Sequence, residues 1–465
     1  MPAITQTLTP RPLRRFRQRP RQVDALLAIV LIVLSVAWSI NAMYHAPQLS
    51  RLDEWTYIDY SWKISAGHIP VRGEALGLEA RTAWSCRGME GAIRKVVPPA
   101  CSEVASHAAH DWPFNGENYN AFHPPFFFLF TGLFGRAFAF VTGAGFVTGA
   151  RVFCALVLAC GIAALYLAIR AWRVRPVAAF AGALVVLATP AVAASGTMVH
   201  SESANALAGA AAVWIGARIF VQHKLGWVVP SLVALAITLT RVVSTVGIIC
   251  VLAMVALSAI FPKAGGFGRS DRRKLVTIVV VGLIAIFGGY FAWSMWQNAR
   301  TPAGYVPAIN GLSTSEFTGQ FAQVIGTLIA PYGITQHPYD WYMQDTLVSD
   351  VLIGWSNNVL YWFYIALPWV GLLAFLGDSA RRLLAGSAAI GPFVAAVVVQ
   401  GRELLTNHSF FRVLSGRYAM AAVPLFGATA AALFDRKILR WVLLGFGLAS
   451  YAVVMASPWL PLTAG

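Results

Sequence analysis

The first long apolar run of the chain is VDALLAIVLIVLSVAWSINAMY, residues 23–44, and the acidic pair Asp53-Glu54 follows shortly after it within RLDEWTY, residues 51–57. A run of about twenty apolar residues is long enough to cross a membrane as a helix. The segment before it, residues 11–22, reads RPLRRFRQRPRQ. Because basic residues beside a span are retained in the cytoplasm, the sequence predicts a cytoplasmic N-terminus and an acidic pair at the extracytoplasmic membrane boundary.

The composition excludes an ordinary soluble protein, since 58% of the residues are hydrophobic, 12% are charged and the mean hydropathy is +0.64. The net charge of +16 does not indicate nucleic-acid binding. Most Lys and Arg residues fall in short segments between apolar runs, whereas a nucleic-acid surface requires them on one soluble face. The basic N-terminal segment is instead expected to contact membrane lipid.

Ten further apolar runs follow the first, so the sequence predicts an all-α polytopic membrane bundle of about eleven transmembrane helices. We expect it to form a single membrane domain over residues 1–465. The further runs lie near residues 148–170, 177–197, 203–221, 226–240, 242–261, 275–297, 353–376, 384–400, 416–434 and 440–457.

The charges of the connections support this topology, because every predicted cytoplasmic connection is basic. If the apolar segment 126–141 crossed the membrane, all the later basic connections would move to the extracytoplasmic side. We therefore expect an interfacial helix there, and Pro124-Pro125 suits its N-terminus. The predicted cytoplasmic residues are Arg170, Arg173, Arg175, Arg218, Lys224, Lys263, Arg269, Arg272, Arg273, Lys274, Arg381, Arg382, Arg436, Lys437 and Arg440.

The same topology divides the rest of the chain into a cytoplasmic basic tail, residues 1–22, and two long extracytoplasmic loops, residues 45–147 and 298–352. The first loop is expected to contain interfacial helices. Cys86 and Cys101 both lie in it, fifteen residues apart. A disulfide between them fits an oxidising compartment, and two unpaired thiols are the alternative.

Further ionisable residues gather at the predicted extracytoplasmic ends of the spans. His200 and Glu202 lie in the turn between the third and fourth spans, and Arg241 lies between the fifth and sixth. Arg417 and Tyr418 open the tenth span. Ionisable groups at membrane depth are costly and usually face a cavity or a partner.

Each of these residues also has a simpler interpretation. Arg241 and Arg417 could be interfacial anchors, and Glu202 could be favoured by the dipole at a helix N-terminus. The acidic pair could be neutralised by Arg51. These alternatives stay open at the level of sequence.

The motifs together resemble the GT-C superfamily, which contains multispanning transferases that use polyprenyl-phosphate-linked sugars. The similar features are the acidic pair after the first span, His123-Pro124-Pro125 followed by aromatic residues, the acidic turn after the third span, and Gly416-Arg417-Tyr418. The chain is most similar to a bacterial branch of membrane proteins of unknown function. It resembles protein O-mannosyltransferases and aminoarabinose transferases more distantly. It departs from the pattern where Glu202 replaces the usual aspartate.

The resemblance implies a glycosyltransferase of the bacterial plasma (inner) membrane that acts in cell-envelope biogenesis. Its donor would be a polyprenyl-phosphate sugar, and its acceptor an extracytoplasmic glycan, lipid or protein. An acceptor hydroxyl needs a base, for which Asp53 is the candidate with Glu54 beside it. The displacement is expected to invert the anomeric centre.

The same resemblance assigns further roles. Cations lower the barrier for a leaving phosphate, so Arg417, Arg241 and His123 are the candidates that bind the donor phosphate. His200, Glu202 and Tyr418 are candidates for a secondary acidic or acceptor site. A divalent cation, Mg²⁺ or Mn²⁺, would be held by Asp53, Glu54 and Glu202.

Two other functions fit the same topology. A transporter or flippase of lipid-linked sugars would share the spans, but it would favour mid-span charges and inverted repeats, and neither is evident. A non-catalytic envelope-assembly subunit could keep the fold without the chemistry. Replacing Asp53 in an activity assay separates this last case from an enzyme.

Overall fold

The computed structural model describes residues 21–89, 97–308, 314–316, 318, 325, 350–411 and 414–460. Seven helices in these ranges are long and apolar enough to cross a membrane, and three shorter helices are also apolar. The regular structure is helical apart from one antiparallel pair, β1 (Thr314–Glu316) with β2 (Ser409–Phe411). The prediction of an all-α polytopic bundle is confirmed. Residues 1–20 of the predicted tail and 326–349 of the second loop lie outside the described ranges.

Each predicted span is helical, although several are divided into shorter pieces. The run at 177–197 breaks at Ala188 and Thr189, because Pro190 starts a new helix and disfavours helical backbone before it. The helices of the bundle are α1 (Arg21–His45), α5 (Phe146–Ala171), α6 (Pro176–Leu187), α7 (Pro190–Ser195), α8 (Asn205–Gly216), α9 (Val228–Thr240), α10 (Val246–Ile260), α12 (Arg272–Arg300), α14 (Asp350–Trp355), α15 (Tyr361–Ala374), α16 (Ser379–Asn407), α17 (Val423–Leu433) and α18 (Leu439–Ala456).

Three of these helices begin after a 3₁₀ turn that either contains a predicted site residue or directly follows one. The turns are η4 (Ser201–Ala204) before α8, η6 (Val242–Thr245) before α10 and η10 (Gly416–Ala422) before α17. The remaining short elements are η1 (Cys101–Ser106), η2 (Ala109–Asp111), η3 (Pro113–Gly116), η5 (Ala217–Val221), α11 (Pro262–Gly265), η7 (Arg269–Asp271), η9 (Ser356–Leu360) and η11 (Ser457–Trp459).

Small residues let the central helices approach each other closely. A Cβ atom on Gly182 of α6 would lie 2.5 Å from the carbonyl oxygen of Gly427 on α17, so neither backbone could stay in place. Backbone approach of this kind is typical of helix packing in membranes, where dispersion contacts rather than the hydrophobic effect hold helices together. The main apolar core therefore lies within the bundle, among α5, α6, α8, α10, α16 and α17.

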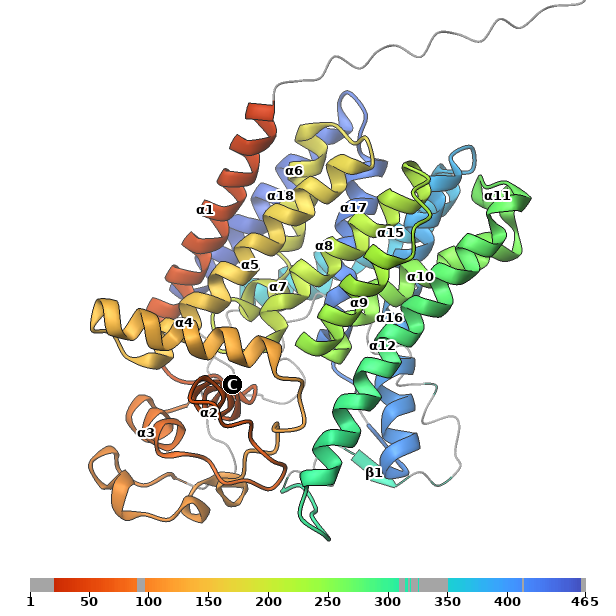
Figure 1. Cartoon of the computed structure of the whole chain (residues 1–465). Coiled ribbons are helices and arrows are strands. Elements are labelled where there is room, and N and C mark those ends of the chain that lie inside the picture. The colour runs from red at the N-terminus through yellow and green to blue at the C-terminus, as the bar shows by residue number, and fades with distance from the viewer. Residues whose placement is uncertain are drawn as a thin grey trace, which may run out of the picture.

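The first loop folds into a second core at one end of the bundle, built from α2 (Glu54–Ser65), α3 (Leu78–Arg87) and α4 (Phe126–Thr142). A Cβ on Gly132 would lie 2.0 Å from the carbonyl oxygen of Ser61, so α4 packs directly on α2. Figure 1 shows α4 lying across the end of the bundle, at a steep angle to α1 and α5. The position of α4 in the membrane interface remains a prediction from the sequence.

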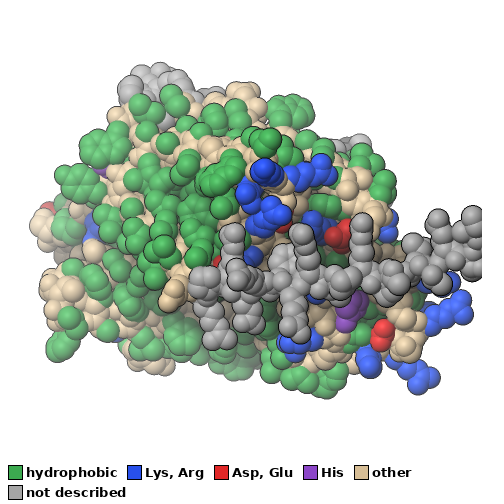
Figure 2. All heavy atoms as spheres, turned by 90° about the horizontal axis from the view of Figure 1, so that it is seen from above, with side chains coloured by type: hydrophobic (Ala, Val, Ile, Leu, Met, Phe, Trp, Pro, Cys, Tyr) green, Lys and Arg blue, Asp and Glu red, His purple; other side chains and the backbone are tan. Residues whose placement is uncertain are grey.

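The two ends of the bundle differ in charge. We call the end that carries the first loop and the turns η4, η6 and η10 the loop face, and the opposite end the basic face. The connections predicted to be cytoplasmic, such as α11 between α10 and α12, lie at the basic face (Figure 1). Seen from above, Lys and Arg side chains gather on part of this face (Figure 2). The orientation of the two faces in a cell remains a prediction from the charge rule.

The structure joins Cys86 at the end of α3 to Cys101 at the start of η1. Closing a loop of about fifteen residues stabilises a fold by about 3 kcal/mol in the chain-entropy view. We expect the Cys86→Ser, Cys101→Ser double variant to lose stability in the first loop and to keep its turnover. Limited proteolysis of residues 45–147 measures the first effect. Unchanged proteolysis would show that the bridge contributes little.

Candidate functional site

Asp53 precedes α2 and has an unusual backbone conformation. Its φ of 62° lies in the left-handed region, which Asp adopts more readily than most residues but which still carries strain. The side chain makes no capping hydrogen bond to α2. It turns to Tyr119, whose hydroxyl donates to Oδ1 at 2.7 Å. Within the described residues, Oδ2 has no hydrogen-bond partner, so one oxygen of this half-buried carboxylate stays available as an acceptor.

The segment that supplies Tyr119 is held along α2 by hydrogen bonds. The amide of Asn120 donates to the hydroxyl of Thr56 at 2.8 Å. The hydroxyl of Tyr60 donates to the carbonyl oxygen of His123 at 2.9 Å. These contacts fix Tyr119 and His123 relative to the first turns of α2, and therefore relative to Asp53.

Glu54 has a different role from the one predicted. It is fully buried, and both of its oxygens accept from Arg151 on α5, from Nε and from Nη2 at 2.8 Å each. The backbone N–H groups of Ser50 and Val199 also donate to it, at 2.6 Å and 2.8 Å. Four donors therefore occupy the two oxygens of Glu54, which leaves little room for a substrate or a cation to contact them. Glu54 therefore connects the first loop to the bundle, and the alternative of neutralisation by Arg51 is not needed to explain its burial.

Glu202 in η4 lies between two arginines from distant parts of the chain. Its Oε1 is 3.0 Å from Nη1 of Arg241 and 3.9 Å from Nη1 of Arg417. The backbone N–H of Glu202 donates to Nδ1 of His200 at 3.1 Å. Because Nδ1 accepts this hydrogen bond, the hydrogen of the neutral ring is on Nε2.

The donors of this cluster are not satisfied. Nε and Nη1 of Arg241, Nη1 of Arg417 and Nε2 of His200 are buried and have no hydrogen-bond partner among the described residues. The 3.0 Å approach of Arg241 to Glu202 is thus an ion pair whose angles do not suit a hydrogen bond. Buried donors without acceptors are costly and rare in folded proteins. Oε1 of Glu202, which lies between the two arginines, is likewise buried without a hydrogen-bond partner, so this cluster holds unsatisfied donors together with an unsatisfied acceptor.

Tyr57 links this cluster to the first loop. Its hydroxyl lies 3.4 Å from Nε2 of His123, and its ring meets the ring of His200 edge-on with centroids 4.6 Å apart. Burial raises the pKa of its phenol above the usual value. Four nearby charges also act on that pKa: Arg241 lowers it, Asp53 raises it, Arg417 lowers it and Glu202 raises it. Asp53, Arg241 and Arg417 therefore lie close enough to Tyr57 for their charges to act on the same phenol.

Both histidines are held neutral. Burial, followed by the charge of Arg241, lowers the pKa of His123 and of His200 well below the ordinary value of 6.5. The 3.6 Å contact between His200 Nδ1 and Glu202 Oε2 is consequently not an ion pair at neutral pH. The positive charge of the site comes from its arginines.

We expect the protein to lose stability in acid. Since the folded pKa values of these histidines are lower than the unfolded value, the unfolded chain binds more protons below about pH 6.5, and the free energy of unfolding falls there. His200→Asn keeps an acceptor for the N–H of Glu202 and should reduce this acid loss. The thermal unfolding midpoint between about pH 7.5 and 5.5 measures it. The exposed His223, replaced by Asn, is the control, and equal pH dependence of both variants would contradict the account.

Predicted residues assigned to three separate roles thus lie together. Asp53, His123, His200, Arg241 and Arg417 surround Tyr57, with Glu202 between the arginines, so the predicted phosphate and acceptor sites form one cluster. Tyr418 lies beside Arg417, whose guanidinium carbon is 5.4 Å from the tyrosine ring centroid.

The predicted metal ligands do not form a metal site. Both oxygens of Glu54 are held by Arg151, and Glu202 faces Arg241. Over the part of the chain that the structure describes, no group of three His, Cys, Asp or Glu residues is placed to hold a metal ion. The set Asp53, Glu54 and Glu202 therefore does not fit a divalent cation.

Three residues of this region were not predicted. Arg151 had a usable signal, because it is a lone arginine in an apolar run at the same end of the bundle as Arg241. Tyr57 and Tyr119 had none, since tyrosines are common at membrane interfaces and nothing in their spacing distinguishes them.

Comparison with known proteins identifies the fold. No protein-family model matches the sequence, and a search of curated proteins finds no match. The structure is similar to the archaeal oligosaccharyltransferase AglB from Archaeoglobus fulgidus in complex with an inhibitory peptide and a dolichol-phosphate. The TM-score is 0.50 at 14% identity, covering 94% of this chain and 56% of that one. A second structure of an Archaeoglobus fulgidus oligosaccharyltransferase, in complex with Zn and sulfate, gives a TM-score of 0.44 at 13% identity, covering 94% and 54%.

The chain therefore shares the overall fold of this archaeal oligosaccharyltransferase structure, in agreement with the resemblance on which the sequence prediction rests. It spans just over half the length of the solved structures that it matches. At this level of identity the likeness defines the fold and not the activity.

Proposed function

We propose that this protein is a glycosyltransferase that moves a sugar from a polyprenyl-phosphate donor to an acceptor at the loop face. The observation that carries the proposal is the pair Arg241 and Arg417, which converge on Glu202 with buried, unsatisfied donors. A phosphate would satisfy these donors. The matched archaeal structure contains dolichol-phosphate, a lipid phosphate of this class.

The proposed reaction is a single displacement at the anomeric carbon. An acceptor hydroxyl attacks that carbon, Oδ2 of Asp53 accepts the hydroxyl proton, and the bond from the anomeric carbon to the phosphate oxygen breaks. The electron pair of that bond leaves with the polyprenyl phosphate. Tyr119 holds the carboxylate in place through Oδ1. Attack opposite to the leaving group would invert the anomeric centre.

The arginines would stabilise the negative charge that develops on the leaving phosphate. Their planar guanidinium groups suit phosphate oxygens, and a site that excludes water strengthens the attraction. Glu202 is a positioning residue in this scheme, since it holds both guanidinium groups before the donor binds. The neutral ring of His123, together with Nε2 of His200, would add uncharged hydrogen bonds.

The test is to incubate the purified protein with a panel of polyprenyl-phosphate sugars and to measure donor binding and the release of polyprenyl phosphate. Arg417→Ala should weaken donor binding by about 1.5–3 kcal/mol, the range of a lost charge-assisted hydrogen bond. Arg417→Lys keeps the charge and should lose only part of this. Arg436→Ala, which removes an exposed arginine at the basic face, is the control. Equal donor binding by Arg417→Ala and Arg436→Ala would remove the phosphate assignment.

The same assay separates the enzyme from the two alternatives. A flippase would move the donor across a bilayer without breaking the glycosidic bond, and a non-catalytic envelope-assembly subunit would bind the donor without consuming it. The charges of this site lie at one end of the bundle, which favours chemistry at that face over transport through the middle. On this proposal the protein works in the bacterial plasma membrane with its loop face outside.

A further inference from the structure

A groove lies between α10 and α12 at the basic face, far from the site described above. It has a volume of about 170 Å³ and is lined almost entirely by apolar side chains, among them Ala256 and Ala259 of α10 and Val276 and Val279 of α12. The 15 residues of α10 rise about 20 Å, and this length separates the groove from Arg241 at the other end of the helix.

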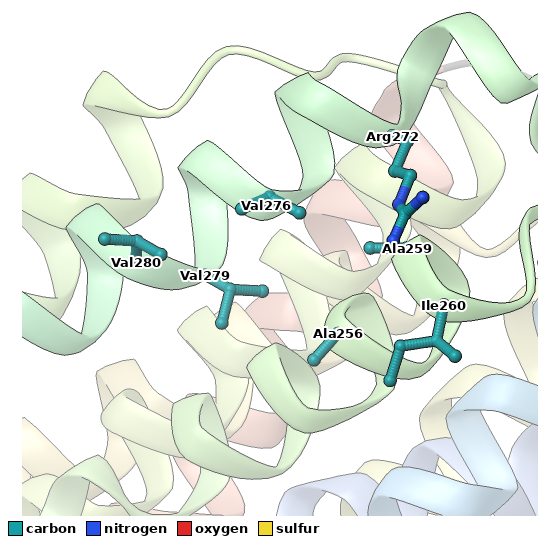
Figure 3. Close-up of a pocket in the computed structure, with 7 residues that line it drawn as sticks. All are labelled: Ala256, Ala259, Ile260, Arg272, Val276, Val279 and Val280. Carbon is teal, nitrogen blue, oxygen red and sulfur yellow. The ribbon is translucent and has the colours of Figure 1, made fainter.

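One charged side chain reaches this apolar groove. Arg272, the first residue of α12, lines it together with the valines. Figure 3 shows the guanidinium group of Arg272 directed from α12 toward the end of α10, beside Ala259. The groove therefore combines an apolar floor with a cation at its membrane-surface end.

The surrounding segment adds more positive charge. Residues 263–274 contain Lys263, Arg269, Arg272, Arg273 and Lys274 against a single acid, Asp271. Oδ2 of Asp271 accepts from the backbone N–H of Gly268 at 3.1 Å. None of the five cations forms an ion pair with another residue in the described ranges.

We propose that this groove binds one acyl chain of an anionic phospholipid, with the lipid phosphate at Arg272. Both helices are long and apolar enough to span a membrane, and the groove lies where the two helices reach its surface. A basic pocket between spans at this level is the arrangement that recognises anionic head groups. The acyl chain of a zwitterionic lipid would fill the apolar floor equally well, but its head group would be attracted less strongly by the five cations. The inference does not depend on the proposed transferase activity.

The experiment is native mass spectrometry of the full-length protein released from neutral detergent. Phosphatidylglycerol and phosphatidylcholine with identical acyl chains are added in parallel, and the bound lipids are counted. We expect preferential retention of phosphatidylglycerol. Arg272→Gln should weaken that retention about fivefold, the effect of one cation near a charged lipid surface. Arg436→Gln, another exposed arginine at the basic face, should leave it unchanged.

A second pair of variants tests the apolar floor. Val276→Trp fills the groove and should lower retention of both lipids, while Val442→Trp on the exposed side of α18 should not. Inorganic phosphate, added in excess, should not displace phosphatidylglycerol, because it lacks the acyl chain. Equal retention of the two lipids, equal behaviour of Arg272→Gln and Arg436→Gln, or displacement by inorganic phosphate would each overturn the proposal.

Discussion

Asp53→Asn should lower the turnover of a polyprenyl-phosphate sugar by about a hundredfold to ten-thousandfold, the usual contribution of a general base. Asn has the size of Asp and can still accept from the hydroxyl of Tyr119, but it cannot take up the proton of an attacking hydroxyl. Donor affinity should change little, because the proposed phosphate contacts come from Arg241 and Arg417. A single-turnover assay with a saturating donor separates the rate from the affinity.

The matched control is Asp111→Asn in the same loop, whose carboxylate contacts His107 at 2.9 Å near the surface. This variant should keep its turnover. If Asp53→Asn also kept near-normal turnover while donor binding persisted, the assignment of the base would be wrong. A loss of donor binding equal to the loss of rate would instead assign Asp53 to donor recognition.

Arg151→Met should destabilise the fold by about 3–5 kcal/mol, because it leaves the carboxylate of Glu54 buried without its ion-pair partner. Met fills similar space, so the loss of stability should come mainly from the lost charge and hydrogen bonds and not from a cavity. The thermal unfolding midpoint in neutral detergent measures it. The more exposed pair Asp24 and Arg170, with atoms 2.8 Å apart, offers the control variant Arg170→Met, which should cost much less.

This second prediction also tests the revised role of Glu54. The fraction of Arg151→Met that remains folded should turn over the donor at a rate close to normal once protein concentration is corrected for unfolding. A specific loss of turnover in stable, folded Arg151→Met protein would return Glu54 to the catalytic machinery.

The bundle could be predicted because it depends on one-dimensional signals. The length of an apolar run and the alternation of basic connections can both be read from the order of residues in the chain, without knowledge of the folded structure. The 3₁₀ turns that begin the spans at residues 201, 242 and 416 carry no such signal. They become visible only when the helices pack and their ends meet at the loop face.

The structure brings most of the charged candidate residues together, whereas Arg151, Tyr57 and Tyr119 were not among the candidates. Arg241 and Arg417 could be selected from the sequence because they are basic residues on the predicted extracytoplasmic side, where the positive-inside rule disfavours them. The pairing of Glu54 with Arg151 could not be predicted, since the two residues lie 97 positions apart and only the fold joins them. The sequence also suggested that adjacent acids act together. The start of α2 separates them instead, burying Glu54 and turning Asp53 toward Tyr119.

The central claim is that Asp53, Arg241 and Arg417 serve one reacting centre, and a structure of the protein with bound polyprenyl phosphate tests it most directly. The account predicts that the phosphate oxygens contact the guanidinium groups of Arg241 and Arg417. It also predicts that the free oxygen of Asp53 faces the space beside the phosphate where a sugar would attach. A phosphate bound elsewhere, with both arginines still turned to Glu202 alone, would contradict the account.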